Sequence, residues 1–436
     1  MRIGIVGAGV TGLVAGYELA KAGHTVVLFE SDANIGGLTR VEKVGGQSLE
    51  RFYHHIFTGD TEMVALLSEL GLSHHLRWKS PQSATYLNRV IYPFSSPMDL
   101  LRFKELPILQ RLALGLLVYR SRFITSWESL EAISAREWIV KNVGQRAYDV
   151  YWSPLLRAKF DDDAELISAA WLWNKFKLRG STRTSHSGRE CFGYLEGSFA
   201  VLYQALAAAI RSMGGQIICS AAVTALWQSD ENGVLLETEA GQYAFDRVIA
   251  TTSPAIFASY CKNMPDTYAK QLKQIRYKAN LCVVLELNCS LSPYYWITLA
   301  EKDFPFVAVV EHTQLVSSGT YGGHIIYLSR YLDATNPLYS ASDEDIEALA
   351  LTSLGQVFHS FDPTLVKSCT VHRAQYAQPV VVQNYSRLIP NMKTPIPGIY
   401  LACMAQIHPE DRGQNYGIRL GRKVATLVEA GGEEQC

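Results

Sequence analysis

The chain opens with a short apolar run, a helical stretch and a second apolar run. Residues 2–6 are apolar and end at a glycine, which is typical of a buried parallel strand. Residues 10–22 carry leucine and alanine at helical spacing, and Gly23 follows where glycine commonly ends a helix. Residues 25–29 form the second apolar run. The pattern predicts a β-α-β unit with a right-handed crossover.

Helical and extended patterns alternate along the rest of the chain. Residues 100–173 have helical periodicity and are rich in Leu, Arg and aromatic side chains. Further strands are expected at 84–92, 216–219, 280–287, 306–310 and 324–328, and further helices at 62–70, 202–210 and 346–358. A strand, a loop and a helix over 398–428 resemble the first unit. Since the chain has neither internal repeats nor a low-complexity linker, we expect interleaved domains.

The composition is that of a globular protein. Of 436 residues, 48% are hydrophobic and 19% charged, which excludes a disordered or fibrous chain. The net charge of −1 argues against nucleic acid as the main partner. The eight cysteines stand singly and lack metal-ligand spacing, so we expect no metal and a reducing, cytoplasmic location. We expect neither a signal peptide nor a membrane-spanning helix.

A glycine motif lies between the first strand and the first helix. Gly7, Gly9 and Gly12 match G-x-G-x-x-G, and Glu30 ends the next strand. In this context the first glycine permits a tight turn, the second lets a pyrophosphate approach the backbone, and the third permits close packing of helix and strand. Glu30 can accept hydrogen bonds from ribose hydroxyls. The motif predicts a bound dinucleotide without distinguishing FAD from NAD.

A glycine pair follows Glu30 closely. Gly36 and Gly37 precede Arg40, and this arrangement resembles the FAD-binding start of the flavin amine oxidase superfamily. That superfamily includes protoporphyrinogen oxidases, carotenoid desaturases and, more distantly, UDP-galactopyranose mutases. The resemblance implies FAD as the cofactor, with the glycine pair passing over the pyrophosphate and Arg40 meeting its charge.

Two later segments resemble the same superfamily. Residues 398–418 resemble its closing FAD motif, which implies that the backbone at Asn415 and Tyr416 meets the isoalloxazine ring. The family usually carries Gly followed by an acid after this strand, whereas here Cys403-Met404 follow it. Val223 stands where the resemblance implies a backbone contact to adenine.

The resemblance implies an α/β fold with two interleaved domains. A Rossmann-like FAD-binding domain is expected over residues 1–90, 195–255 and 395–436. An α+β substrate domain is expected over residues 91–194, which are mainly helical, and 256–394, which form a mixed sheet.

Four residues are candidates for proton transfer or charge positioning on the substrate side: His54, His55, Tyr376 and Arg412. Imidazole exchanges protons near neutral pH, and His55-Ile56-Phe57 resembles the H-I-F of UDP-galactopyranose mutases, in which a histidine lies beside the flavin. In amine oxidases a lysine holds a water near flavin N5. Lys278 and Lys302 are available for that role, and the sequence does not choose between them.

Two basic stretches bear on the substrate, which we expect to be a small molecule. Residues 152–160 are aromatic and basic, and Arg179, Arg183 and Arg189 follow in a Gly- and Ser-rich loop. These residues are suited either to an anionic substrate or to a solvated surface. The pattern of residues 100–122 predicts one basic amphipathic helix. Such a helix is typical either of peripheral membrane contact, in which case the substrate could be linked to a lipid, or of an ordinary helix of the substrate domain. The oligomeric state stays open.

The function that follows is FAD-dependent oxidoreduction, with hydride transfer from a substrate C–H to flavin N5. One alternative is a redox-neutral sugar isomerase similar to UDP-galactopyranose mutase. Another, of a different class, is a non-catalytic binding protein similar to the Rab GDP-dissociation inhibitors, which resemble this fold and carry no flavin.

Overall fold

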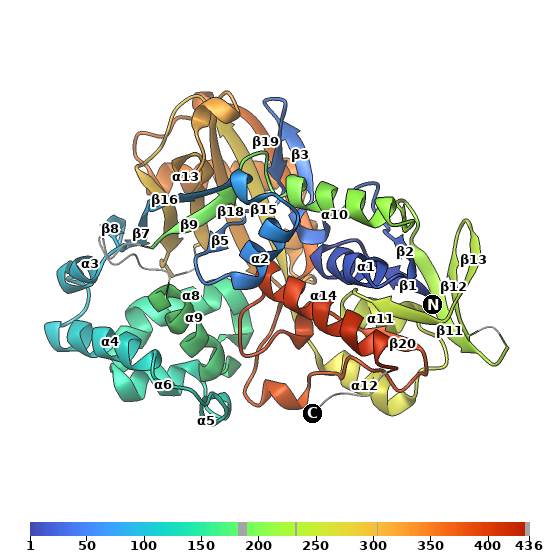
Figure 1. Ribbon diagram of the computed structural model, residues 1–436. Coiled ribbons are helices and arrows are strands. Elements are labelled where there is room, and N and C mark those ends of the chain that lie inside the picture. The colour runs from blue at the N-terminus through green and yellow to red at the C-terminus, as the bar shows by residue number, and fades with distance from the viewer. Residues whose placement is uncertain (182–189, 232, 303, 432–436) are drawn as a thin grey trace.

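The computed structural model describes residues 1–181, 190–231, 233–302 and 304–431. Two large sheets organise these residues, and a helical lobe lies beside the larger sheet (Figure 1). The smaller sheet has five parallel strands in the order β10 (Gln216–Ile218), β2 (Thr25–Phe29), β1 (Arg2–Val6), β14 (Arg247–Ala250) and β20 (Ile399–Leu401). Its strands come from three distant parts of the chain. The fold is therefore α/β and interleaved, as the sequence predicts.

The predicted β-α-β unit is confirmed at the N-terminus. β1 and β2 pair in parallel with Ile5 opposite Leu28, and both side chains are fully buried. The helix between them, α1 (Val10–Lys21), starts within the glycine motif of residues 7–12, which we call the phosphate loop. Gly23 has a φ of +85°, which lets the backbone turn at the end of the helix.

Helix α1 packs between α10 (Ala200–Ser212) and α14 (Gln414–Glu429). A Cβ at Gly421 would lie 2.7 Å from the carbonyl oxygen of Thr11, so only glycine permits this approach of α14. Gly417 is similarly restricted, because its Cβ would lie 2.6 Å from a methyl group of the first turn of α1. These two glycines place the start of α14 beside the phosphate loop.

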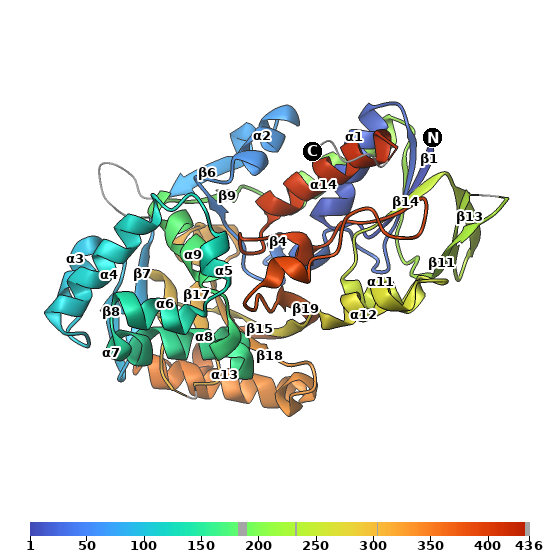
Figure 2. The same ribbon diagram turned by 90° about the horizontal axis from the view of Figure 1, so that it is seen from below.

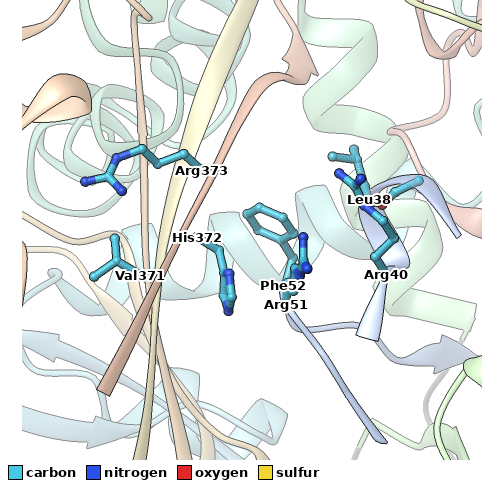
Figure 3. A pocket seen from close by; sticks show the side chains of 8 residues that line it. Leu38, Arg40, Arg51, Phe52, Val371, His372 and Arg373 are labelled. Atoms are coloured by element: carbon cyan, nitrogen blue, oxygen red, sulfur yellow. Dashed lines mark hydrogen bonds between the residues drawn. The ribbon is translucent and has the colours of Figure 1, made fainter. Parts of the chain in front are cut away.

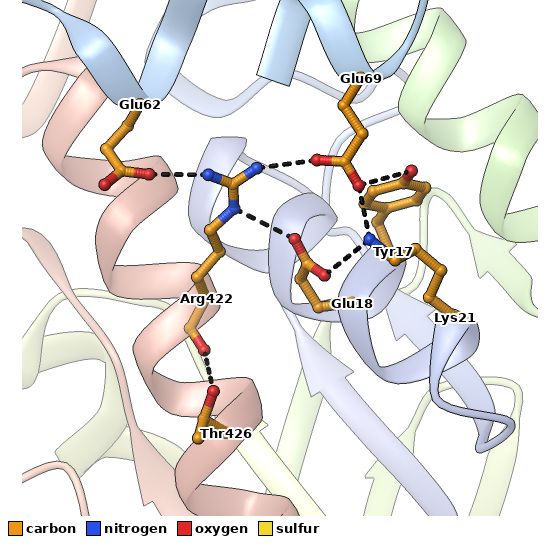
Figure 4. Close-up of polar contacts among 7 residues, drawn as sticks. All are labelled: Tyr17, Glu18, Lys21, Glu62, Glu69, Arg422 and Thr426. Atoms are coloured by element: carbon orange, nitrogen blue, oxygen red, sulfur yellow. Dashed lines mark hydrogen bonds and ion pairs between the residues drawn. The ribbon is translucent and has the colours of Figure 1, made fainter. Parts of the chain in front are cut away.

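An ion-pair network connects α2 (Thr61–Glu69) to α1 and α14 (Figure 4). Arg422 of α14 donates to Glu18 at 3.1 Å, Glu62 at 2.7 Å and Glu69 at 2.9 Å. About a quarter of each of these side chains is exposed. The network therefore lies at the surface, where it joins three helices of the cofactor side of the molecule.

The larger sheet has seven strands in the order β19 (Val366–Pro379), β15 (Tyr277–Leu287), β18 (His324–Leu332), β17 (Ala308–Glu311), β16 (Tyr294–Leu299), β7 (Gln82–Leu87) and β8 (Val90–Pro93). Helix α13 (Asp343–Val357) packs along its outer face (Figure 2). The boundary expected at residue 90 is too late, because β7 already belongs to this sheet. β7 pairs in parallel with β16, a partner so far along the chain that local sequence patterns do not reveal it.

The helical lobe has its own core, in which Trp173 is almost fully buried. Its helices are α3 (Pro97–Arg102), α4 (Ile108–Ser121), α5 (Glu128–Glu131), α6 (Ala135–Asn142), α7 (Gln145–Ala147), α8 (Ser153–Phe160) and α9 (Ala169–Ser181). The single helix expected over 100–122 is wrong: α3 and α4 are separate. Pro107 precedes α4, and proline has no N–H to continue a helix from α3.

Smaller elements complete the structure. The strands that begin at Gly233 and Gly241 pair with each other within a three-stranded sheet. The remaining strands are β3 (Val41–Val44), β4 (Gln47–Glu50), β5 (Ile56–Phe57), β6 (Leu76–Lys79), β9 (Phe192–Leu195), β11 (Val223–Ser229), β12 (Gly233–Thr238) and β13 (Gly241–Phe245), and the remaining α-helices are α11 (Pro254–Tyr260) and α12 (Asp266–Gln274).

Candidate active site

The predicted phosphate loop lies between β1 and α1. Gly7 has a φ of +101°, and a Cβ at Gly12 would lie 2.0 Å from the carbonyl oxygen of Gly7, so packing requires glycine at both positions. Gly9 differs, because its φ is −76° and a Cβ there would approach no described atom closer than 3.7 Å. The protein itself does not require glycine at position 9. An anion bound at the N-terminus of α1 would require it.

The glycine pair folds back over this loop. Gly36 and Gly37 have φ values of +121° and +57°, and the N–H of Gly36 donates to the carbonyl of Ala8 at 2.9 Å. A Cβ at Gly37 would lie 3.2 Å from the Cα of Gly9, so the two backbones face each other closely. The Nε of Arg40 donates to the carbonyl of Gly37 at 3.0 Å. This segment thus places a cation beside the phosphate loop.

Glu30 lies at the end of β2 with 7% of its surface exposed. Its carboxylate accepts hydrogen bonds from the N–H of Ala8 at 2.9 Å and of Asp32 at 3.0 Å. The N–H of Ala221 donates to the Glu30 carbonyl at 2.8 Å, which brings Val223 at the start of β11 close by. A carboxylate has about four lone-pair positions, so Glu30 retains acceptor capacity for ribose hydroxyls.

The start of α14 supplies a second helix N-terminus. No side chain of the described residues caps α14, so its first N–H groups are available to a ligand. Asn415 is buried, and its Oδ1 accepts from the N–H of Met63 at 3.1 Å, which fixes α14 against α2. Burial raises the pKa of the Tyr416 phenol, which therefore stays neutral.

These features together fit FAD. The loop and the glycine pair suit a pyrophosphate, Glu30 suits a ribose, and the uncapped start of α14 suits the electron-rich edge of a flavin. At the end of β20, where the family usually carries an acid, the N–H of Cys403 donates to the Oε1 of Gln406 at 2.8 Å. This backbone group is thus satisfied within the protein.

A buried carboxylate, Asp411, lies just before α14. It accepts hydrogen bonds from the following groups: Lys159 Nζ at 3.1 Å, Trp171 Nε1 at 3.0 Å, Gln378 Nε2 at 3.2 Å and Lys175 Nζ. Burial alone would raise the pKa of Asp411, but the charges of Lys159, Lys175 and Arg412 outweigh burial and hold the pKa well below its usual value. Asp411 is therefore ionised at neutral pH. We call these five hydrogen-bonded residues the Asp411 cluster.

Arg412 and His54 lie together beside this cluster. Arg412 donates through Nε to Gln378 Oε1 at 2.9 Å and through Nη2 to the Tyr331 hydroxyl. The Nδ1 of His54 lies 2.7 Å from the carbonyl oxygen of Phe52. Burial, together with the charge of Arg412, lowers the pKa of His54 to about 4, so its imidazole is neutral at physiological pH.

The other two candidates lie in different surroundings. His55 is enclosed by aromatic rings, with its Nδ1 3.0 Å from the Tyr295 hydroxyl and its ring centroid 4.6 Å from that of Phe192. Tyr376 of β19 packs edge-on against Tyr277, with centroids 5.6 Å apart. The structure thus brings His54 and Arg412 together. It places His55 and Tyr376 in two separate aromatic contacts.

Sequence reasoning missed the lysines of the Asp411 cluster. Lys278 is fully buried and ion-paired with Asp163 at 3.1 Å and Asp333 at 2.8 Å, and Lys302 lines a separate surface groove. Lys159 lies in the aromatic and basic stretch 152–160. The composition of that stretch was the feature of the sequence that could have indicated this lysine. Of the three loop arginines, Arg183, Arg189 and the side chain of Arg179 lie outside the described residues.

A basic cavity of about 230 Å³ opens beside the glycine pair (Figure 3). Arg40, which is ion-paired with Asp32, lies on one side, and His372 of β19 lies on the other, 3.0 Å from Glu42. The cavity is lined by Gly37, Leu38, Arg40, Arg51, Phe52, Val371, His372 and Arg373. Through Gly37, which faces Gly9, the cavity adjoins the phosphate loop.

The family of the chain follows from its sequence as a whole. A family model described as flavin containing amine oxidoreductase matches residues 10–427. The chain belongs to this family, which makes it an FAD-dependent oxidoreductase and confirms FAD as the predicted cofactor.

Individual relatives agree with that class. Protoporphyrinogen oxidase 2 of Arabidopsis thaliana is 27% identical over 41% of this chain, and the match spans only 37% of the relative. The 15-cis-phytoene desaturase of Glycine max is 24% identical over 92% of this chain and 75% of the relative. A crystal structure of reduced UDP-galactopyranose mutase, 16% identical, superimposes with a TM-score of 0.76 over 99% of this chain and 96% of the other. At that identity the superposition shows a shared fold.

Proposed function

We propose that this chain transfers a hydride from a C–H bond of a small-molecule substrate to N5 of FAD. One observation carries the proposal: Gly417 and Gly421 hold the start of α14 beside the phosphate loop. Arg412 immediately precedes this helix start, and its charge acts on the nearby imidazole of His54. A cofactor bound along the loop would thus reach side chains that hold charge and protons.

The proposed FAD site combines three parts of the chain. The phosphate loop and the glycine pair would hold the pyrophosphate, Glu30 and the backbone of Val223 would hold the adenosine, and the start of α14 would hold the flavin. The residues that we assign to it are Gly7, Gly9, Gly12, Glu30, Gly36, Gly37, Arg40, Val223, Asn415 and Tyr416.

Residues of the chain prepare the site for this chemistry. FAD, when bound, supplies the two-electron acceptor. The N–H groups at the start of α14 stabilise negative charge placed next to them. Because the Nδ1 of His54 lies against a carbonyl oxygen, that nitrogen carries the proton and Nε2 carries the lone pair. His54 can therefore accept a hydrogen bond from a substrate at Nε2, whereas its pKa of about 4 disfavours full transfer of the proton.

The Asp411 cluster and Arg412 fix charges at the boundary between the helical lobe and the larger sheet. Lys159 lies over the rings of Trp171 and Tyr331, at 4.9 and 5.6 Å from their centroids. These aromatic side chains exclude water and hold the lysine in one place. Arg412 is oriented by Gln378 and Tyr331, which suits it to position a substrate.

Flavin binding is the first test. Variants at two glycines distinguish a loss of FAD binding from a loss of folding. Gly9→Ala should leave a folded chain whose Kd for FAD is raised about tenfold or more, because the methyl group would occupy ligand space only. Gly12→Ala should reduce folding as well, because its Cβ collides with a backbone oxygen. The matched control is Gly355→Ala, an exposed helical site with open space around the new methyl group. Flavin absorbance and circular dichroism provide the two readouts.

Hydride transfer is tested by anaerobic reduction of the bound flavin. The names of the relatives suggest a porphyrinogen and a phytoene as first substrates. Bleaching of the flavin by a substrate, with one oxidised product per reduced flavin, supports the proposal. A purified protein that neither carries nor gains FAD contradicts it, and so does substrate isomerisation without use of an electron acceptor.

A further inference from the structure

The exposed apolar side chains of this protein are concentrated on α3 and α4. Leu109, Leu112, Leu116, Tyr119 and Phe123 are between 49% and 76% exposed. They repeat at alternate intervals of three and four residues, so those within α4 form one stripe along the helix, and Phe123 continues the pattern just beyond its end. Both views place α3 and α4 at the outer edge of the molecule (Figures 1 and 2).

Folding of the lobe does not account for this stripe, because α4 has a second apolar face that is packed. Leu114 and Leu117 are buried, and the carbonyl of Ser121 accepts a hydrogen bond from the indole N–H of Trp173 at 2.8 Å. That face attaches α4 to α9. The exposed stripe therefore adds nothing to the core, and contiguous apolar surface of this kind usually marks an interaction site.

Helix α3 extends the apolar surface. Arg111 of α4 donates to the carbonyls of Leu101 and Leu106, each at 2.6 Å, and so fixes the corner between the two helices. Met98 and Leu101 of α3 are 52% and 37% exposed. We call the exposed apolar residues of this region the α3–α4 surface: Met98, Leu101, Ile108, Leu109, Leu112, Leu116, Tyr119 and Phe123.

The charge around this surface is positive, although the whole chain has a net charge of −1. Residues 97–123 contain five basic and two acidic side chains. Both acids have local roles: Asp99 completes a capping box with Ser96, and Glu105 accepts from Asn88 at 2.7 Å and from Tyr92. The exposed Arg102, Lys104 and Arg120 border the apolar stripe. Apolar side chains bordered by cations complement an anionic lipid surface.

We propose that the α3–α4 surface docks this protein on the face of a membrane that contains anionic lipid. The apolar side chains enter the boundary between headgroups and acyl chains, and the basic side chains contact the headgroups. Among the described residues no helix is long and apolar enough to cross a bilayer. The docking that we propose is accordingly peripheral, and it does not depend on the reaction proposed above.

Sedimentation of the FAD-loaded protein with vesicles tests this docking. One vesicle is phosphatidylcholine alone, and the other contains about a third phosphatidylserine. The variant Leu109→Ser/Leu112→Ser/Leu116→Ser should lose vesicle binding roughly tenfold or more, and Arg102→Gln/Lys104→Gln/Arg120→Gln should lose it mainly on the anionic vesicles. The control Met213→Ser/Ile256→Ser alters side chains that are 37% and 38% exposed elsewhere, and it should bind as the parent does.

Two results would overturn the docking proposal. One is a parent protein that fails to sediment with anionic vesicles. The other is a serine variant that binds vesicles as well as the parent while its circular dichroism and flavin spectrum are unchanged. If the parent is a dimer that the serine variant dissociates, and neither binds vesicles, then a second copy of the chain covers this surface.

Discussion

This protein has two charge clusters that differ in burial and in the sign of the central charge. One is an exposed cation among carboxylates, and the other is a buried anion among amines. At the surface, Arg422 is surrounded by three glutamates, and about a quarter of each side chain is exposed. In the interior, Asp411 has an exposed fraction of 8% and is approached by the amines of Lys159 and Lys175, with the guanidinium of Arg412 nearby. Each cluster joins elements that are distant in sequence.

The difference shows how burial changes what an ion pair does. Charges at the surface are solvated in both the folded and the unfolded protein, so each ion pair contributes little to the free energy of unfolding. A buried charge cannot return to water, so loss of its partners is costly and its ionisation state is fixed. The Arg422 network therefore joins three helices but contributes little to the free energy of unfolding. The Asp411 cluster instead holds ionised side chains in place at the proposed active site.

Neutralising the buried cluster should have the largest effect. Asp411→Asn keeps the shape of the side chain and removes its charge, which leaves Lys159 and Lys175 without their buried anion. We expect the free energy of unfolding to fall by about 3–5 kcal/mol. Urea denaturation of the FAD-loaded protein measures the change. A loss below about 1 kcal/mol would mean that the cluster behaves like a surface network.

A second buried carboxylate sharpens the comparison because its hydrogen bonds come from neutral groups. Glu50 is 1% exposed and accepts from the Tyr194 hydroxyl and from the N–H of Phe199 at 2.7 Å. Burial raises its pKa to about 7, even though both hydrogen bonds lower it. The folded protein thus holds this proton at pH values where the unfolded chain, with a pKa of 4.5, has released it.

Glu50 should therefore make stability fall as the pH rises. Its contribution is complete below pH 4.5 and is lost as the pH rises through about 7, a change of about 3 kcal/mol. Glu50→Gln stays neutral and should lack this component. Urea denaturation at several pH values between 5 and 8 measures the difference between the two proteins. Parallel stability curves would show that Glu50 is ionised in the folded state.

The smallest effect is expected at the surface network. Arg422→Met keeps the length of the side chain and removes all three ion pairs, and we expect a loss of about 1 kcal/mol or less. The loss should shrink further at about 0.5 M NaCl, because salt screens exposed charges. Urea denaturation at low and high salt tests both statements. A salt-independent loss larger than that of Asp411→Asn would reverse the comparison.

The cofactor side of the molecule could be predicted from sequence because its signals are local. The phosphate loop, the glycine pair and Glu30 lie within about 35 consecutive residues, and each acts mainly through backbone geometry that the residue type itself indicates. Gly9 illustrates this well. Its conformation is ordinary and its surroundings are open, so packing of the protein does not explain the glycine, and the proposed pyrophosphate does.

The substrate side could not be predicted to the same extent, because side chains from distant elements meet there. Asp411 contacts α8, α9 and β19, and no periodicity or spacing connects these segments before the chain folds. The aromatic contacts of His55 with Phe192 and of Tyr376 with Tyr277 likewise join distant segments. Similarly, sequence alone showed that residues 100–122 carry apolar and basic side chains, but it showed neither the break at Pro107 nor which face of α4 is packed.

The order of strands in the five-stranded sheet has a consequence for how the protein folds during synthesis. β1 is made long before β20 and α14, which follow only near residue 400. A nascent chain shorter than this has a phosphate loop, but it lacks the strand next to β14 and one of the two helices that pack against α1. The cofactor site therefore matures last, after the larger sheet and the helical lobe have emerged, and its assembly must await the closing of the longest loops in the chain.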